Sequence, residues 1–336
     1  MIRQTLVNIF FFFPVWIIKT LLFFNKTKIR KYIFDQQSKA LLALLPKFNL
    51  QELSDNEIAL IREKIEKKRK NIRLSLKPTK KVVKKDIIID QISKLKLREY
   101  TPYFVDTEIV MLFFHGGGYV LNSIDVYDDF IAYMSEELRI KIYSLEYSLS
   151  PESKFPQALN ESLLSIDWLN KKGIDMNKIS LCGDSAGAHL AASTSHQLAI
   201  NNENFLHSQF LIYPMCDPGC NSESHHLFGD GFFLTKKSME WFWQKFSNKS
   251  DDNKNPLFNL LLFNKRHKIQ QTILVTAGFD PLCDEGEAYA LRLHECGNEV
   301  KQLHYPTLFH GFASMSRLQS AKKAVKNFLI EYKKIL

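Results

Sequence analysis

Residues 179–192 read Ile-Ser-Leu-Cys-Gly-Asp-Ser-Ala-Gly-Ala-His-Leu-Ala-Ala, an apolar run followed by a glycine-flanked serine and a run of small residues. Its apolar start predicts a buried strand, and the small residues from Ala186 onward predict a helix. The Gly-x-Ser-x-Gly pattern between them predicts a sharp turn, which presents Ser185 at the strand tip above the helix N-terminus. Positions 183 and 187 are expected to require glycine because this turn is crowded. The context therefore predicts that Ser185 is a nucleophile.

A second glycine-rich stretch ends an earlier strand pattern. Residues 109–114 are apolar, and residues 115–118 after them read His-Gly-Gly-Gly. Glycines leave backbone N–H groups unobstructed and allow a substrate to come close. Attack on an ester places negative charge on the carbonyl oxygen, and one fixed N–H donor is typically worth about 3 kcal/mol of barrier. We expect an oxyanion hole formed by the N–H groups of Gly116, Gly117 and Ala186.

A serine nucleophile of this kind needs an acid and a base, which follow it in the order aspartate, histidine in an α/β-hydrolase. The strand pattern 272–277 runs into Asp280, and the strand pattern 300–305 runs into His310. Both residues come just past the carboxyl end of a strand, where ligands bind in open α/β sheets. We expect His310 to take the proton of Ser185 and pass it to the leaving alcohol, while Asp280 orients the imidazole.

Other residues of the same types compete for these roles. Asp284 is the alternative acid, but it stands at the start of a helix, where acidic residues commonly serve the helix dipole. His115 is a candidate base whose expected role is to order the glycine loop by hydrogen bonding. His304 lies within a strand pattern and His294 within a helical one, so both are expected to be structural.

With these motifs, the chain resembles the hormone-sensitive-lipase-like family of α/β-hydrolases, which includes bacterial carboxylesterases and arylacetamide deacetylase. The resemblance covers roughly residues 35–336. Its matching stretches are His115 to Tyr119, Tyr147 to Glu152 with Phe155 and Pro156, Gly183 to Gly187, Asp230 to Thr235, Asp280 to Leu282 with Asp284 to Gly286, and His310 to Phe312. It implies a serine esterase without a cofactor, with a helical cap over the site. The chain departs from the family at Ser148, Ala188 and Ser153-Lys154, none of which is an expected catalytic residue.

Length and charge narrow the class of protein. At 336 residues, the chain is long enough for one large core with a small cap. The formal net charge is +9, but residues 62–85 alone carry twelve Lys and Arg against Glu63 and Glu66, a net of +10. The rest of the chain is near neutral, so the total charge does not argue for nucleic-acid binding. The basic stretch fits a solvated helix face and linker, with contact to anionic lipid as the alternative.

The cysteines give no sign of a metal site or of a disulfide framework. They are odd in number, and the spacing of Cys182, Cys216, Cys220, Cys283 and Cys296 fits no zinc pattern. We therefore predict no metal. Cys216 and Cys220 would form a bridge only in an oxidising compartment, and free thiols in a reducing one are the favoured interpretation.

Residues 5–24 are the least family-like part of the chain. They are apolar-rich and approach the bilayer span of about 20 residues, but Pro14 and Lys19 interrupt them. No small-residue cleavage site follows, which argues against a removable signal peptide. The basic residues after the segment favour the cytoplasm or the cytoplasmic face of a membrane over secretion. The alternatives are a membrane anchor or surface helix, an apolar helix packed on the cap, and a secretory signal.

The remaining chain alternates between strand and helix patterns. Strands are expected at 86–91, 108–114, 139–146, 178–183, 208–214, 272–277 and 299–305, and helices near 125–137, 156–171, 186–200, 285–296 and 318–335. This alternation predicts an α/β-hydrolase fold, with a mostly parallel central sheet covered by helices on both faces.

Three parts are expected along the chain. Residues 1–34 are the apolar N-terminal segment and possible anchor. Residues 35–85 hold two cap helices, one ending at Pro46 and one opened by the capping box at Ser54, and then an exposed basic linker from Lys77. Residues 86–336 form the hydrolase domain, with a second cap segment at about 215–260. The aromatic residues of that segment either line an acyl pocket or pack the cap core; they are Phe232, Phe233, Trp241, Phe242 and Trp243.

Together these features predict a serine carboxylesterase that hydrolyses short to medium acyl esters through an acyl-enzyme. The same groups would serve an amide deacetylase, or a lipid esterase at a membrane that residues 5–24 contact. A non-catalytic ligand receptor on the same scaffold is a further alternative. The family's receptor branch lacks the catalytic histidine, whereas His310 is present here.

Overall fold

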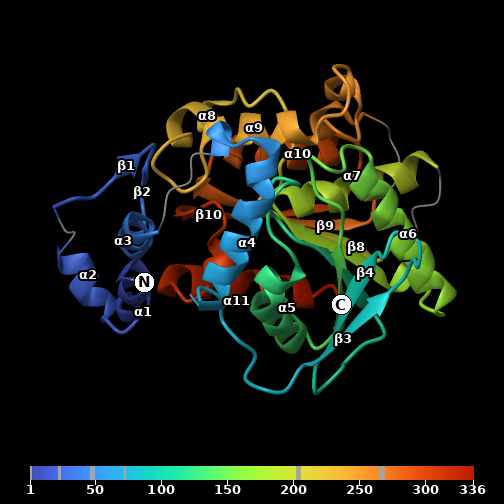
Figure 1. Cartoon of the computed structure of the whole chain (residues 1–336), viewed down its shortest axis with the longest axis horizontal. Helices are drawn as coiled ribbons and strands as arrows, with labels where there is room; N and C mark the ends of the chain where they lie inside the picture. Colours follow the sequence, from blue (N-terminus) through green and yellow to red (C-terminus); the bar gives the residue numbers. More distant parts are fainter. Residues whose placement is uncertain (1, 22–23, 46–49, 72, 202–205, 265–268) are drawn as a thin grey trace.

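The computed structural model of the chain describes residues 2–21, 24–45, 50–71, 73–201, 206–264 and 269–336. Its centre is an eight-stranded sheet in the order β10-β9-β8-β7-β5-β6-β4-β3 (Figure 1). The strands are β3 (Val83–Ile88), β4 (Lys96–Thr101), β5 (Val110–Phe114), β6 (Lys141–Glu146), β7 (Ile179–Asp184), β8 (Ser208–Ile212), β9 (Gln271–Phe279) and β10 (Val300–Phe309). All pairs from β10 to β6 are parallel, and the two pairs that include β4 are antiparallel.

Helices cover both faces of this sheet. One face packs against α6 (Gln157–Lys171), α7 (Ala186–Ile200) and α10 (Cys283–Glu295), and the other against α5 (Ile124–Leu138) and α11 (Gln319–Lys333). Alternate residues of β5 enter the two cores: Leu112 and Phe114 enter the first, and Met111 and Phe113 the second. Strands buried on both faces are typical of parallel sheets under crossover helices. The predicted fold class is confirmed.

Most predicted elements agree closely with those observed, and the largest departure is at the antiparallel edge. β3 begins at Val83, inside the stretch expected to be an exposed linker. β4 was not expected at all. Its sequence, Lys-Leu-Arg-Glu-Tyr-Thr, is mostly polar, and its two buried residues, Leu97 and Tyr100, point to opposite faces of the sheet. Such a strand lacks the alternation of apolar and polar residues by which strands are recognised.

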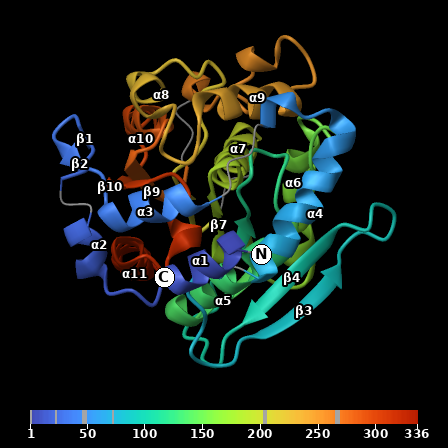
Figure 2. The same ribbon diagram turned by 60° about the vertical axis from the view of Figure 1, so that its left-hand side comes forward.

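Two helices of the second expected cap segment, α8 (Glu223–Phe228) and α9 (Lys236–Phe246), lie along the top of the molecule in Figures 1 and 2. α4 (Asp55–Asn71), from the first expected cap segment, runs down from beside α9. The Ser54 N–H donates to Glu57 Oε2 at 2.9 Å, as the capping box predicts. An ion pair between Lys245 and Asp55 joins α9 to α4. The two cap segments, distant in sequence, are therefore in contact.

The N-terminal segment is divided into short helices. α1 (Ile2–Phe10) and α2 (Val15–Leu21) are separated around Pro14, which lacks the N–H that a continuing helix would need. Both pack on α3 (Gln36–Leu44), which ends before Pro46, a residue outside those described. β1 (Lys28–Ile29) and β2 (Tyr32–Ile33) form a small hairpin between α2 and α3. Among the described residues, no helix has both the length and the apolar character needed to cross a bilayer.

Candidate active site

The turn between β7 and α7 holds Ser185 in an unusual backbone conformation. Its φ is +55° and its ψ is −119°, outside the regions that non-glycine residues normally adopt. A Cβ added to Gly183 would lie 2.3 Å from the Gly187 backbone, and one added to Gly187 would lie 2.0 Å from the carbonyl oxygen of Phe114. The two glycines thus allow the close approach that the sequence indicated, and the turn places the Ser185 hydroxyl at the strand end.

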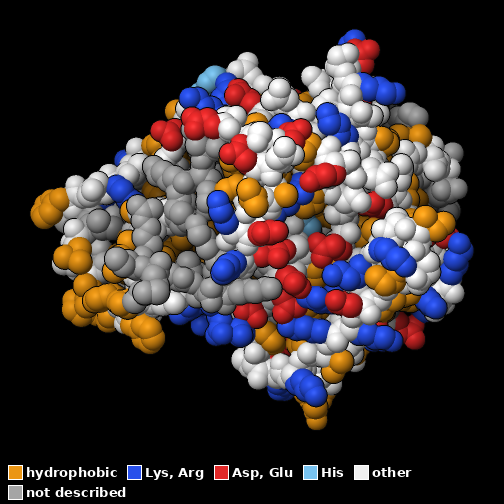
Figure 3. Space-filling view, viewed as in Figure 1, with side chains coloured by type: hydrophobic (Ala, Val, Ile, Leu, Met, Phe, Trp, Pro, Cys, Tyr) orange, Lys and Arg blue, Asp and Glu red, His pale blue; other side chains and the backbone are white. Residues whose placement is uncertain are grey.

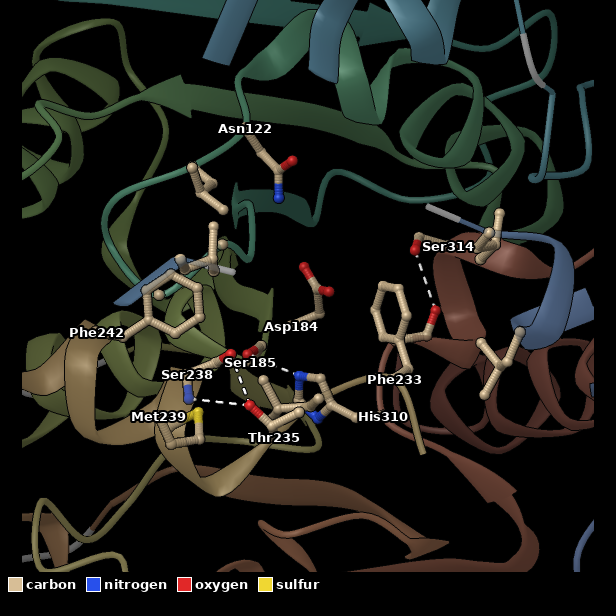
Figure 4. Close-up of a pocket in the computed structure, with 18 of the residues that line it drawn as sticks. Asn122, Asp184, Ser185, Phe233, Thr235, Ser238, Met239, Phe242, His310 and Ser314 are labelled. Atoms are coloured by element: carbon tan, nitrogen blue, oxygen red, sulfur yellow. Dashed lines mark hydrogen bonds between the residues drawn. The ribbon is translucent and has the colours of Figure 1, made fainter. Parts of the chain in front are cut away.

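The structure brings the predicted nucleophile, base and acid together. His310 Nε2 lies 2.9 Å from Ser185 Oγ, and His310 Nδ1 lies 2.8 Å from Asp280 Oδ2. Figure 4 shows Ser185 and His310 facing each other in the cavity. Because a carboxylate only accepts, Nδ1 carries the proton, and the neutral Nε2 is left to accept the proton of the serine hydroxyl. The other oxygen of Asp280 accepts the Leu282 N–H at 2.9 Å, which fixes the carboxylate in the loop.

The competing residues have other partners. The Asp284 carboxylate pairs with Arg30 at 3.0 Å and accepts the Ser224 N–H at 2.7 Å. His115 is buried and stacks on Tyr147, with ring centroids 4.4 Å apart, and this position fits a role in ordering the loop.

The expected oxyanion donors need one correction. The Gly116 N–H donates to Asp184 Oδ1 at 2.8 Å, so it is not available to a substrate oxygen. Gly117 and Gly118 line the cavity beside Ser185. The Ala186 N–H is the first of α7, and N–H groups of a first helical turn have no partner within the helix. Gly118 is not among the donors expected from the sequence.

Asp184 is a buried carboxylate that sequence analysis did not single out. Besides the Gly116 N–H, it accepts the hydroxyl of Tyr127 at 2.9 Å. Burial raises the pKa of this carboxyl group to about 6, and the hydrogen bonds it accepts act in the opposite direction. The only signal in the sequence was its place before Ser185 in the motif. Through Gly116, Asp184 ties the glycine loop to the end of β7.

Replacing Asp184 with asparagine is expected to lower kcat by roughly tenfold and to change KM little. The Gly116 N–H donates to Oδ1 and the Tyr127 hydroxyl to Oδ2, and asparagine replaces one of these two acceptor oxygens with an NH2 donor, so one of the two hydrogen bonds is lost as it stands. Losing an oxyanion donor outright costs roughly 10²–10³ in kcat, and a loosened loop should cost less. Steady-state kinetics on a short nitrophenyl ester measure the change, and an unaltered kcat would show that this contact does not position the loop.

A cavity of about 800 Å³ opens above Ser185 and His310. Apolar side chains from both cap segments form much of its wall, including Leu42, Leu45, Leu50, Ile65, Leu234 and Met239. Phe233 and Phe242 also line it and lie on either side of the catalytic pair in Figure 4. Trp241 and Trp243 are instead buried in the core cluster. The cap aromatics therefore divide between the two roles that the sequence left open.

Several known proteins with a similar sequence or structure are ester hydrolases of the α/β-hydrolase fold. A family described as having the alpha/beta hydrolase fold matches residues 111–314. LipN, a carboxylic ester hydrolase of Mycobacterium tuberculosis, is 31% identical over 70% of this chain and 66% of its own length. An ethyl acetate hydrolase of Pseudomonas putida is 31% identical over 67% and 73% of the two chains. An esterase of the fungus Rhizomucor miehei has a similar structure, with a TM-score of 0.81 at 25% identity, over 90% of this chain and 96% of its own.

Proposed function

The chain belongs to the hormone-sensitive-lipase-like family of α/β-hydrolases and is a carboxylic ester hydrolase, and we propose that it is a serine esterase that acts through an acyl-enzyme. The observation that carries the proposal is the hydrogen-bonded chain from Ser185 through His310 to Asp280. The three side chains are already within hydrogen-bond distance of one another, so none has to move far before proton transfer.

In the proposed reaction, Ser185 Oγ attacks the ester carbonyl while His310 Nε2 takes its proton. The imidazolium then gives that proton to the leaving alcohol, and the acyl group remains on the serine. A water molecule, activated by the same nitrogen, hydrolyses the acyl-enzyme and restores the serine. Asp280 holds the Nδ1–H tautomer and stabilises the imidazolium in both halves of the cycle.

We propose the N–H groups of Gly117, Gly118 and Ala186 as the oxyanion hole. Gly117 and Gly118 line the cavity, and the Ala186 N–H begins the helix that follows the nucleophile. A Cβ on Gly118 would lie 2.1 Å from the ring of Phe242, so only a glycine leaves room for the aromatic wall at this point. Fixed donors of this kind stabilise the charge of the tetrahedral intermediate without reorganising.

The cavity supports esters of short to medium acyl chains as substrates. Its volume and largely apolar wall suit a small apolar ligand held by a few polar groups. A panel of nitrophenyl esters from acetate through octanoate to palmitate tests this proposal, with a nitroanilide of the best acyl group as the matched amide. We expect the highest kcat/KM between acetate and octanoate. A maximum at palmitate would favour the lipid esterase, and preference for the anilide would favour the deacetylase.

We also propose that α1 and α2 rest on a membrane surface without crossing it. Figure 3 shows apolar side chains gathered at the lower left, where Figure 1 places these helices. Phe12 is 84% exposed and Trp16 is 68% exposed, whereas Val7 and Ile18 face the core. Exposed basic residues follow the helices at Lys28 and Lys31, which suits anionic headgroups. A short helix with one apolar face outward is typical of interfacial binding.

Replacing Phe12 and Trp16 together with serine is expected to abolish most binding to vesicles that contain anionic lipid, because these side chains supply the apolar area for insertion. Hydrolysis of a small soluble ester should be unchanged. Ile92→Ser is the matched control, since Ile92 is 94% exposed but lies in the β3–β4 turn. Co-sedimentation measures the binding. Equal binding by the double variant and the control would refute the membrane contact.

A further inference from the structure

Three side chains with metal-binding atoms meet between α10 and β10, outside the proposed mechanism. The cluster comprises Cys283 Sγ, Glu287 Oε1 and His304 Nδ1, and these atoms all lie within 4.8 Å of one another. Cys283 Sγ is 3.7 Å from Glu287 Oε1, and His304 Nδ1 is 3.4 Å from the same oxygen. The first two residues are one helical turn apart on α10, and His304 approaches them from β10.

We propose that Cys283, Glu287 and His304 form a Zn²⁺ site, with water as the fourth ligand. A thiolate, an imidazole and a carboxylate are the donors that zinc takes in proteins, at distances of about 2.0–2.3 Å. In a tetrahedral site with those bond lengths, the ligand atoms lie about 3.3–3.6 Å apart. The two separations given above are close to this range, so the side chains need only small adjustments to close around the ion.

Zinc binding would displace a hydrogen bond and a proton from the cluster. His304 Nδ1 lies 2.9 Å from Thr276 Oγ1, and the zinc bond replaces this hydrogen bond. The Cys283 proton passes to solvent as the zinc–sulfur bond forms. Two positive charges oppose the ion: Arg30 acts on Cys283 and His304, and Lys31 acts on His304. The Arg30 guanidinium is paired with Asp284 at 3.0 Å and with Glu223 at 2.6 Å. Glu287 and the thiolate together neutralise the charge of the ion.

The site lies close in sequence to both the proposed acid and the proposed base. The Cys283 N–H donates to the carbonyl oxygen of Asp280 at 3.1 Å, so the first ligand belongs to the turn that holds the proposed acid. β10, which carries His304, runs on to His310. Bound zinc would therefore join the helix after the acid to the strand before the base. The metal supplies no step of the proposed reaction, and the zinc site does not depend on the proposed esterase activity.

Cobalt substitution tests the site directly. The full chain, stripped with a chelator and reduced, is titrated with Co²⁺, and Zn²⁺ is then added in competition. We expect stoichiometric binding, with intense d–d bands of a tetrahedral site and a thiolate-to-cobalt charge-transfer band, all bleached by Zn²⁺. Cys283→Ala should lose the charge-transfer band, and Cys283→Ala and His304→Ala should each weaken Zn²⁺ binding by more than about a hundredfold, because even an outer partner of a ligand is worth about 10–100-fold.

Matched controls lie on the same helix. Cys296→Ala and His294→Ala change a thiol and an imidazole near the end of α10, and both should bind Co²⁺ as the wild type does. Ser185→Ala should bind it equally well, which separates this result from the fate of the esterase proposal. Should Cys283→Ala fail to fold, His304→Ala and Glu287→Gln decide by the same affinity measurement. Absence of the charge-transfer band in the wild type, or its persistence in folded Cys283→Ala, would overturn the proposal.

Discussion

Replacing Ser185 with alanine is expected to lower kcat for ester hydrolysis by about a million-fold, the size of loss found when a serine hydrolase loses its nucleophile. The hydroxyl is the only group at this point of the turn that can form the acyl-enzyme, and it lies 2.9 Å from the base. Alanine fits the same backbone with no added atoms, so the fold should be kept. Steady-state kinetics on a nitrophenyl ester measure the residual kcat.

The control for this variant is a serine on the same helix. Ser193 is buried in α7 and donates to the carbonyl oxygen of Leu257 at 2.8 Å, away from the cavity. Ser193→Ala should keep most of the activity, although it loses that hydrogen bond. Residual activity of Ser185→Ala above a few per cent of the wild type would mean that another group is the nucleophile.

Asp280→Asn should lower kcat by about ten-thousand-fold, whereas Asp284→Asn should have a much smaller effect. Asp280 Oδ1 accepts the Leu282 N–H, so an asparagine that keeps this bond turns its NH2 group toward His310 Nδ1 and favours the wrong tautomer of the imidazole. The corresponding change in a serine protease has a cost of this size. Asp284 instead pairs with Arg30 and accepts the Ser224 N–H, and it takes no part in the hydrogen bonds that join Ser185, His310 and Asp280. The two variants are compared by kcat on the same ester.

The ranking of these two variants is the informative result. If Asp284→Asn were the more impaired of the two, the acid would be misassigned. His310→Ala provides a further check, because it should lose as much as Ser185→Ala. The double variant should then lose no more than either single one, since the two residues act as a unit.

The sequence located the three central residues because each stands where a recognisable strand ends. Ser185 is the centre of the Gly-x-Ser-x-Gly motif and follows β7, and Asp280 and His310 follow two later strands of the parallel part of the sheet. Since the carboxyl ends of parallel strands meet at one edge, residues far apart in the chain could be placed together. The structure supplied the distances, from which the tautomer of His310 is inferred, and no sequence pattern contains them.

The oxyanion donors could not be assigned fully from the sequence. Three successive glycines offer three N–H groups, and their directions depend on how the loop folds over Asp184. That carboxylate takes the Gly116 N–H, a contact between residues 68 positions apart in the chain. Gly117 and Gly118 remain beside the cavity. A buried acceptor under a loop leaves no local signature, so the correction needed three-dimensional information.

The N-terminal segment and the sheet edge show two other limits. Residues 5–24 are nearly long enough for a bilayer span, but Pro14 divides them into two short helices with one buried face. β4 was missed because a strand at an antiparallel edge can be mostly polar and still pair on both sides. In both cases the local sequence did not reveal the structure of the segment, which the tertiary contacts of a few apolar residues decided.

The most direct test of the central claim is covalent labelling with a fluorophosphonate, which reacts only with an activated serine. Mass spectrometry of the intact protein and of its peptides measures the number of labels and their position. We expect a single label on Ser185, absent in Ser185→Ala and strongly slowed in His310→Ala. No label on the wild type, or a label on a different serine with hydrolysis intact, would contradict it.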